Sequence, residues 1–498
     1  MRTVRTILIL LAAFLAVLAC KKTPQSIEEP DPDPAPTSIT LSESSFTVAQ
    51  GGEEITLTVT SPAQPQISVP DWITLVEGVY KNYQVIVILR VGANISFNPR
   101  EADVTVSSSN ASAVSLKISQ SALKRPETGT PPEGWEKASD TAKNMGAGWN
   151  LGNTLDSNSG DVNNMWIEAY SSRNPSDYET AWGQPVATQK LIHMFKDAGF
   201  NAIRVPVTWY PHMGTITVSG TQWDKSSWTG FDVDPAWMAR VKEVVDYVIS
   251  EGMYCILNVH HDTGEYSTSW LRADKAVYKS VYDRYSALWT QIATEFQSYG
   301  PQLVFESFNE MLDTKGTWNY SSADAHETIN MYNADFVTTV RATGGNNVWR
   351  NLILNTYGAS CQPQALSDFR VPEDIVEGHL MAEVHSYAPY HFAFDTDSPQ
   401  TVFDASCESE IKGLVENMNN YLVKKGIPCV LGEYGCTASR TETEMAKQAA
   451  CYVAAATRYS IPCFYWMGLS DGADRSVPKW TMPEIKDAIL KAYRDNRN

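Results

Sequence analysis

From residue 135 to the C-terminus, short apolar runs of the kind that form buried strands alternate with longer stretches of helical periodicity. Eight such strand-and-helix units follow one another along the chain. Parallel strands that are each followed by a helix can close into a (β/α)8 TIM barrel. An open doubly wound sheet is the alternative, but it would usually carry a glycine-rich phosphate turn, and the sequence has none. The expected strands are residues 145–152, 202–207, 254–260, 303–309, 351–357, 381–387, 428–434 and 463–469.

Two of the expected helices have clear boundary signals. Asp234 is a good N-cap and Pro235 suits the first turn, while Gly252 follows the apolar stripe and would end the helix. A second stripe, which includes Leu191, stops before Gly199 in the same way. These signals support the α/β alternation.

Residues 38–122 have a different pattern, that of an all-β region. Ile55, Leu57 and Val59 alternate with polar residues, and about six short strands of this kind suit a small immunoglobulin-like β-sandwich. The region resembles a BACON domain, which is common at the N-terminus of exported polysaccharide-degrading enzymes, and residues 118–122 are similar to the ending of that family. A sugar-binding role and a spacer role both stay open. Residues 123–134 contain three prolines and are expected to link the sandwich to a catalytic domain at 135–498.

The first 19 residues have the features of a signal peptide. Arg2 and Arg5 precede an apolar run at 7–19 that is too short to span a membrane well. Residues 15–20 resemble a bacterial lipobox, which implies cleavage before Cys20 and a lipid on its thiol; a plain secretory signal is the alternative. The resemblance implies an exported protein that is lipid-anchored to the bacterial cell envelope, on its surface or its periplasmic face. Residues 20–37 would then be a disordered tether.

The composition excludes some classes of partner. A net charge of −18 argues against nucleic acid and anionic membrane surfaces, whereas a neutral polysaccharide is indifferent to that charge. No CxxC motif occurs, so a zinc site of that type is not expected. A disulfide among Cys361, Cys407, Cys436 and Cys451 stays open. The sequence predicts a monomer that uses no metal and no cofactor.

Two glutamates, Glu310 and Glu433, each follow a strand-like apolar run. In a barrel of parallel strands, catalytic groups lie where the strands end, on the C-terminal face. A glycosidase needs two carboxyl groups on either side of one glycosidic bond. Either glutamate alone could be an ordinary solvated charge, but polar residues at the other strand ends favour a shared site.

The polar residues at the strand ends follow a specific order, which is Arg, His, Asn-Glu, His-x-Tyr, Glu and Trp. Its members are Arg204, His260, Asn309, Glu310, His385, Tyr387, Glu433 and Trp466. This order resembles the functional residues of glycoside hydrolase family 5, and the resemblance spans about residues 138–493. The strings at 148–156 and 309–310 look most like the endoglucanase and xyloglucanase branch. The resemblance implies a retaining hydrolase with Glu310 as acid/base and Glu433 as nucleophile.

The other members of this set have expected roles around the two carboxyl groups. In a retaining glycosidase these groups lie about 5–5.5 Å apart, so the ionisation of one affects the other. Arg204 is expected to keep Glu433 ionised, and Tyr387 can donate its phenol to the same carboxylate. Asn309 can reach the sugar 2-hydroxyl, and His385 is expected to form part of the polar wall.

Further residues are expected to bind the substrate. The neighbouring histidines could suggest a metal, but adjacent side chains on a strand point to opposite faces, so a polar wall beside the sugar is expected instead. Trp466 is the expected sugar platform, and aromatic residues in loops after strands are expected to line further subsites. The expected substrate-binding residues are Asn153, His260, His261, Trp270, Tyr357 and Trp466.

Three functions are compatible with these residues. An endo-β-1,4-glucanase that acts on cellulose-like chains, mixed-linkage glucan or xyloglucan is the interpretation that the two strings favour. A mannanase or xylanase would use the same mechanism. A non-catalytic glycan-binding lipoprotein is disfavoured because Glu310, Glu433 and Arg204 are all present.

Overall fold

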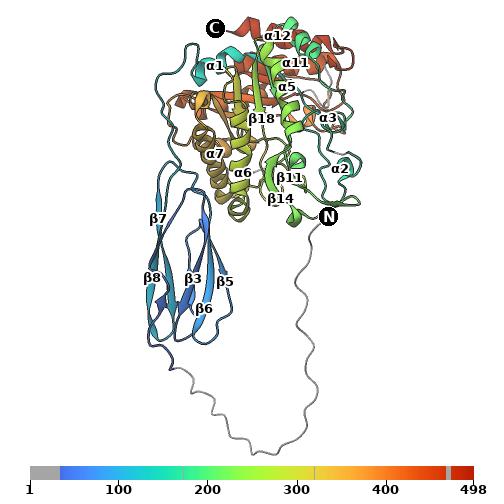
Figure 1. The fold of residues 1–498 in the computed structure, drawn as a ribbon. Coiled ribbons are helices and arrows are strands. Elements are labelled where there is room, and N and C mark those ends of the chain that lie inside the picture. The colour runs from blue at the N-terminus through green and yellow to red at the C-terminus, as the bar shows by residue number, and fades with distance from the viewer. Residues whose placement is uncertain (1–33, 172, 319, 467–472, 498) are drawn as a thin grey trace, which may run out of the picture.

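The computed structural model describes residues 34–171, 173–318, 320–466 and 473–497. The chain forms an N-terminal β-sandwich and a larger barrel domain, and the sandwich lies against one side of that domain (Figure 1). The predicted signal peptide, Cys20 and most of the predicted tether lie outside the described residues. Within the described part of the chain, no helix is both long and apolar enough to cross a membrane.

The N-terminal region is all-β, as predicted, with two four-stranded sheets in the orders β1-β3-β6-β5 and β2-β8-β7-β4. Strand alternation buries Ile55, Leu57 and Val59 between the sheets. The structure has more strands than expected because the shortest ones have too few residues to show a period of two. The strands are β1 Thr40–Leu41, β2 Ser45–Val48, β3 Glu53–Thr60, β4 Gln66–Ser68, β5 Ile73–Glu77, β6 Gln84–Val91, β7 Arg100–Ser108 and β8 Ala111–Gln120.

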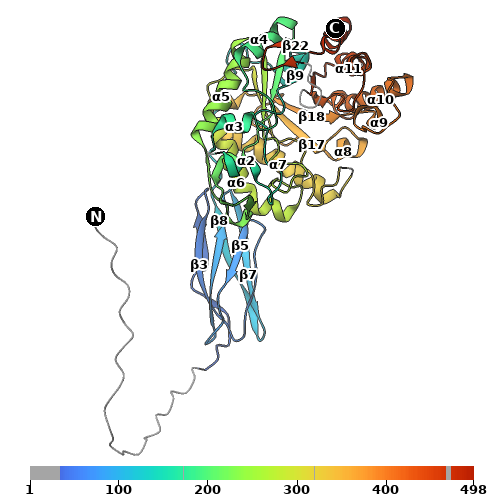
Figure 2. The same cartoon turned by 90° about the vertical axis from the view of Figure 1, so that its right-hand side faces the viewer.

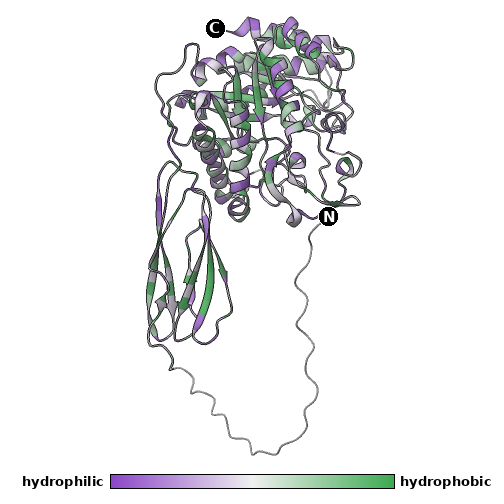
Figure 3. Ribbon diagram, in the orientation of Figure 1, coloured by the Kyte–Doolittle hydropathy of each residue, from purple (hydrophilic) through white to green (hydrophobic). Residues whose placement is uncertain are grey.

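The second domain is a closed barrel of eight parallel strands, and each corresponds to a predicted strand. Going round the barrel, the order is β9-β10-β15-β16-β17-β18-β19-β20. Figure 2 shows the helices around these strands, and Figure 3 shows that the strands are the most hydrophobic part. The barrel strands are β9 Ala147–Asn150, β10 Ala202–Val205, β15 Tyr254–Asn258, β16 Leu303–Glu306, β17 Leu352–Ser360, β18 Leu380–Ser386, β19 Cys429–Tyr434 and β20 Cys463–Tyr465.

The predicted helix boundaries are confirmed where the sequence gave signals. Asp234 accepts a hydrogen bond from the Ala236 amide at the start of α5, and Gly199 ends α4 in the left-handed conformation. The helices are α1 Ala138–Met145, α2 Trp166–Tyr170, α3 Pro175–Glu179, α4 Gln189–Ala198, α5 Pro235–Ser250, α6 Lys275–Glu295, α7 Ala323–Ala342, α8 Pro363–Asp368, α9 Tyr390–Ala393, α10 Ala405–Tyr421, α11 Glu442–Thr457 and α12 Pro483–Asn496. In the described part of the loops, three antiparallel two-stranded sheets form: β11 Met213–Thr215 with β14 Thr229–Val233, β12 Val218–Ser219 with β13 Gln222–Trp223, and β21 Ala473–Asp474 with β22 Lys479–Trp480.

The barrel interior has an apolar layer below a polar layer. The apolar cluster lies toward the N-terminal ends of the strands, where α1 covers it. It includes Ala202, Ile256, Val304, Ile353, Met381 and Val430. Because inward side chains recur at every second strand residue, the next inward positions form the polar layer. These positions are Asn150, Arg204, Asn258, Glu306, Asn355 and Glu383, and all of them are buried. The buried polar layer of the barrel therefore packs directly against a hydrophobic layer.

The sandwich is packed directly against α6. Gly92, at the end of β6, approaches Tyr282 so closely that an added Cβ would overlap the phenol, reaching 3.1 Å from Cζ. Lys279 forms an ion pair with Asp71 at 2.5 Å, although both side chains are exposed, so this pair contributes little stability. The close approach at Gly92 is therefore a tight packing contact between the two domains.

Candidate active site

Arg204 is the centre of the polar layer. Its Nε and Nη2 lie 2.7 and 2.8 Å from the two carboxylate oxygens of Glu306, and its Nη1 lies 2.8 Å from Glu433 Oε1. Its other hydrogen bonds go to the amide oxygens of Asn150 and Asn309, at 3.0 and 2.9 Å. Arg204 therefore holds the expected nucleophile, and also a second carboxylate that the sequence analysis did not single out.

Charge–charge interactions decide the ionisation of this layer. Burial alone would lower the pKa of Arg204, but the negative charges of Glu306 and Glu383 raise it well above its ordinary value. Burial alone would raise the pKa of Glu306, but the adjacent guanidinium holds it below its ordinary value. The two residues therefore form a buried ion pair in which both partners are charged.

Glu433, in β19, is held from two sides. Arg204 binds its Oε1, and the Tyr387 hydroxyl donates to its Oε2 at 2.8 Å. Burial, followed by the charge of Glu433, raises the pKa of Tyr387 well above its ordinary value, so the phenol stays a donor. The register between β18 and β19 shifts after Val384, and this bulge sets Glu433 opposite His385. Both contacts expected for Glu433 are present.

Glu310 faces Glu433 and is the more accessible of the two, with 20% of its side chain exposed. One carboxylate oxygen of Glu310 lies within 4.8 Å of one oxygen of Glu433. Carboxyl groups lie about 5–5.5 Å apart in retaining glycosidases and about 6.5–9.5 Å apart in inverting ones. Burial, together with the charge of Glu433, raises the pKa of Glu310, although His385 opposes this shift. The spacing is therefore that of a retaining enzyme.

His385 connects Glu310 to Glu383. Its Nδ1 lies 2.8 Å from Glu310 Oε1 and its Nε2 lies 3.0 Å from Glu383 Oε1. Burial would lower the pKa of His385, but the charge of Glu433 and the bond to Glu310 raise it to about 10. The ring is therefore an imidazolium at neutral pH and donates from both nitrogens. In that state it offers no lone pair to a metal.

His260 and His261 lie just beyond the end of β15 at Asn258. The expectation that their side chains point to opposite faces is wrong, because the alternation stops where the strand ends. Their ring centroids are 4.4 Å apart. The donor atoms of both histidines and of Asp156 lie within 4.8 Å of one another, so the protonation of the rings decides whether they could hold a cation.

The tautomer of His260 follows from its neighbour Asn258. The Val207 amide donates to Asn258 Oδ1 at 3.1 Å, so the Asn258 NH2 group faces His260 Nδ1, at 3.0 Å. The ring proton is then on Nε2, which lies 3.9 Å from Glu433 Oε1. This nitrogen is a hydrogen-bond donor and not a metal ligand, which supports the predicted polar wall.

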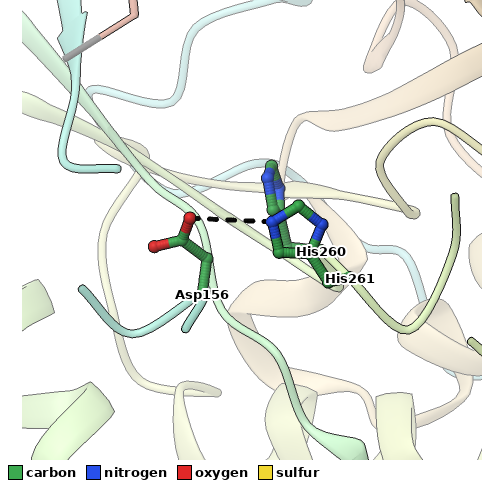
Figure 4. A group of neighbouring side chains, drawn as sticks. All are labelled: Asp156, His260 and His261. Atoms are coloured by element: carbon green, nitrogen blue, oxygen red, sulfur yellow. Dashed lines mark ion pairs between the residues drawn. The ribbon is translucent and has the colours of Figure 1, made fainter. Parts of the chain in front are cut away.

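Asp156 lies beside the ring of His261 (Figure 4), with Oδ2 3.8 Å from Nε2. Burial lowers the pKa of His261 to about 3 and raises that of Asp156 to about 6. The ring is therefore neutral at neutral pH, and the two do not form an ion pair. Asp156 instead accepts hydrogen bonds from the amides of Asn153 and Thr154, at 3.0 and 2.7 Å, and so fixes the loop after β9.

Trp466 follows β20 and borders the same site. Its ring is nearly parallel to that of His260, with an interplanar angle of 8° and centroids 5.8 Å apart. It packs over Gly152, where an added Cβ would come within 2.8 Å of the indole. Trp466 is 8% exposed, and its expected role as a sugar platform stays a prediction.

Trp270 and Tyr357 do not present the open ring faces that the sequence analysis expected. Trp270 is 4% exposed, and its indole donates to Asp262 Oδ1 at 2.6 Å. Tyr357 is 2% exposed, and its hydroxyl donates to the Thr317 carbonyl at 2.8 Å. Both side chains fill the space under the loops, so they brace the loops instead of offering a surface to a sugar.

Comparisons with known proteins agree with this geometry. The model of the cellulase family (glycosyl hydrolase family 5) matches residues 161–471. The chain belongs to glycosyl hydrolase family 5. Endoglucanase A of Clostridium longisporum is 36% identical over 372 residues, which are 72% of this chain and 66% of that protein.

Two solved structures of this hydrolase family are similar over the barrel domain. A family 5 enzyme from Prevotella bryantii B14, in complex with a xyloglucan tetradecasaccharide, is 38% identical, with a TM-score of 0.64, covering 73% of this chain and 100% of that one. A broad-specificity endoglucanase from Ruminococcus champanellensis with bound cellotriose is 36% identical, with a TM-score of 0.64, covering 72% and 99%. The protein is therefore a glycoside hydrolase of the retaining type.

The inward carboxylates Glu306 and Glu383 of this hydrolase were not predicted from the sequence. Glu306 ends β16 and Glu383 lies within β18, each two positions after an inward apolar side chain, Val304 or Met381. A glutamate at an inward position of a buried strand is costly unless it is paired, and this is the signal that could have revealed them.

We expect Arg204→Lys to lower turnover by at least about 100-fold, because a Lys ammonium cannot hold two carboxylates and two amides in fixed directions. Unfolding free energy should fall by about 3 kcal/mol, since a buried carboxylate loses its partner. Turnover per folded molecule and denaturant unfolding measure the two effects. Arg341→Lys is the control, because Arg341 is also buried but binds Asp374 at 2.7 Å, outside the site; it should lose stability only. Full turnover by folded Arg204→Lys would contradict this role.

Proposed function

We propose that this hydrolase cleaves internal β-1,4 bonds of glucan chains, xyloglucan included, by a double displacement that retains the anomeric configuration. The observation that carries the proposal is the close pair of Glu310 and Glu433. The Arg204 guanidinium and the Tyr387 hydroxyl both bind the carboxylate of Glu433. The glucan substrate is supported by the similar proteins, which include an endoglucanase, an enzyme in complex with a xyloglucan oligosaccharide and an enzyme with bound cellotriose.

In the first step, Glu433 attacks the anomeric carbon while Glu310 gives its proton to the glycosidic oxygen that leaves. Glu310 holds that proton because burial and the charge of Glu433 raise its pKa. Arg204 and Tyr387 keep the attacking carboxylate in place. Asn309 uses its amide oxygen for Arg204, which turns its NH2 group to the substrate, where it can bind the sugar 2-hydroxyl.

In the second step, the glycosyl ester on Glu433 carries no charge, so Glu310 becomes more acidic. It can then remove a proton from water, whose oxygen attacks the anomeric carbon and releases Glu433. Two inversions at one carbon give net retention. In this cycle the two carboxyl groups and water carry out the proton and glycosyl transfers, while Arg204 and Tyr387 hold the nucleophile in place.

Exposed aromatic rings at the rim support binding of a long chain. Tyr390 is 61% exposed, and its ring is stacked on that of Phe394, with an interplanar angle of 24°. The ring centroids of Phe394 and Tyr387 are 5.9 Å apart, and Tyr387 binds Glu433, so the exposed pair lies next to the reacting carboxyl groups. Trp318 and Tyr320 are also exposed, in the segment that follows Glu310. Sugar rings stack on such faces, and an open rim allows internal cleavage.

A panel of polysaccharides tests the proposed substrate. We expect new reducing ends from mixed-linkage glucan, xyloglucan and carboxymethylcellulose, with viscosity falling early in the reaction, as internal cleavage requires. The same assay on mannan and xylan covers the alternative substrates. Cleavage of mannan or xylan alone, or release of monosaccharides from chain ends only, would refute the glucanase proposal.

Azide separates the roles of the two glutamates. Glu310→Ala should lower turnover of glucan by about 10³, yet azide should restore its activity on an activated aryl glycoside and give a β-azide. Glu433→Ala should lose the covalent step, and any azide product should have the α configuration. Glu77→Ala, at an exposed position at the end of β5 in the sandwich, is the inert control. The NMR spectra of the products measure the outcome, and exchanged anomers would reverse the assignment.

We also propose that the protein is exported, cleaved before Cys20 and lipid-anchored to the bacterial cell envelope as a monomer, with the BACON-like sandwich as a spacer. The lipobox-like residues 15–20 support the anchor. The contact between Gly92 and Tyr282 supports the spacer role, because it places the sandwich on α6 and outside the barrel interior.

We expect Cys20→Ala to move the protein from the membrane fraction to the soluble fraction of a bacterium that processes lipoproteins, because the acyl chains provide the anchor. Immunoblots of both fractions measure the shift. Cys451→Ala, which removes a partly exposed free thiol of the barrel domain, should leave the distribution unchanged. If both variants stay with the membrane, lipidation is not the anchor.

A further inference from the structure

Glu383 is a buried carboxylate that the double displacement described above does not use. It lies in β18, and its Oε1 is 3.0 Å from His385 Nε2 and 3.4 Å from Arg204 Nη2. Its Oε2 is buried without a hydrogen-bond partner among the described residues. A carboxyl group in this state is costly, so its presence needs an explanation.

The fold provides a specific space for this carboxyl group. An added Cβ at Gly432 would overlap the carboxyl group of Glu383 and reach 2.9 Å from its Cγ. Gly432 is also the extra residue of the bulge between β18 and β19, which sets His385 opposite Glu433. The glycine therefore makes room for Glu383 directly beside the nucleophile strand.

Glu383, His385 and Glu310 form a continuous chain of hydrogen bonds. One nitrogen of His385 faces Glu383 and the other faces Glu310, at 3.0 and 2.8 Å. Fixing one nitrogen of an imidazole fixes the direction of the other. Glu383 therefore decides where the second ring proton of His385 points.

We propose that Glu383 is a positioning residue for the acid/base: it holds the His385 ring so that Nδ1–H points at Glu310, and its charge keeps the proton on Glu310 in alkaline solution. The inference rests on the proposed role of Glu310 as acid/base. The imidazolium alone would draw the proton away from Glu310, and a carboxylate on the far side of the ring offsets that effect.

The charged groups around Glu383 set the direction of its titration. They are Arg204 on β10, Glu306 on β16 and His385 on its own strand, with the Cys429 thiol on β19. Burial, followed by the charge of Glu306, raises the pKa of Glu383 to about 7, although Arg204 and His385 oppose this shift. Glu383 is therefore neutral in acid and gains a negative charge above about pH 7. That charge raises the pKa of Glu310 and extends its acid form to higher pH.

Glu383→Gln tests the proposal, since glutamine resembles the neutral carboxyl group and cannot ionise. On barley mixed-linkage glucan, the alkaline limb of kcat/KM should move down by about one pH unit, so the rate falls about tenfold at pH 8.5. At pH 5.5 the rate should stay within about threefold of the wild type. On 2,4-dinitrophenyl β-cellobioside, whose leaving group needs no proton, the alkaline limb of the wild type and variant should coincide.

Glu179→Gln is the matched control, because Glu179 is equally buried and binds Arg240 at 2.8 Å outside the site. It should lose stability without a change in the pH profile. An alkaline limb of Glu383→Gln that matches the wild type on glucan, or a shift of equal size on the aryl glycoside, would overturn the proposal. A wild type that does not cleave the glucan would instead refute the proposed substrate, and the aryl glycoside would still report on the enzyme.

A measurement on the wild type covers the case in which Glu383→Gln does not fold. In ¹⁵N NMR of the histidine rings, both nitrogens of His385 should carry protons at pH 7, with the signal identified by its loss in His385→Gln. A His385 ring with one unprotonated nitrogen at that pH would overturn the proposed hydrogen-bond chain.

Discussion

The site depends on one buried cation. Arg204 lies between Glu306 and Glu433 and within 3.4 Å of Glu383, so three carboxyl groups share its charge. Burying so many acids without it would cost several kcal/mol for each ion. The barrel makes the arrangement possible because strands all round it direct side chains into one layer, while the adjacent apolar layer excludes water. The strength of the Arg204 contacts in turn fixes the position at which Glu433 meets the substrate.

Most of the fold could be predicted because its signals are local. Buried parallel strands leave continuous apolar runs, and the caps at Asp234 and Gly199 mark helix ends within a few residues. Strand-end residues such as Glu310 and Glu433 were also visible, since a polar group after an apolar run is conspicuous. The family resemblance also predicted that Arg204 and Tyr387 contact Glu433, whereas the buried carboxylates Glu306 and Glu383 were missed. Which acid meets Arg204 depends on how far the strands are staggered around the barrel, and one sequence does not contain that stagger.

The loops show the same limit of prediction from sequence. Trp270 and Tyr357 follow strands in the sequence, as a sugar-binding aromatic would, but the loops fold over them and bury them. Tyr390 and Phe394 stay exposed because the short helix α9 holds them at the rim. Similarly, the contact of Gly92 with Tyr282 joins residues far apart in the chain, so only the three-dimensional structure shows that the sandwich is docked. Exposure is a property of the assembled loops and not of residue type.

The overlap of position 432 with the carboxyl group of Glu383 also limits how this protein can evolve. A side chain fits at position 432 only if residue 383 is smaller than glutamate. A smaller residue at 383, however, leaves a void beside His385 as long as residue 432 is glycine. Each single step is unfavourable although the double change restores the packing. The two positions are therefore epistatic, and in divergent relatives they should change as a pair or not at all.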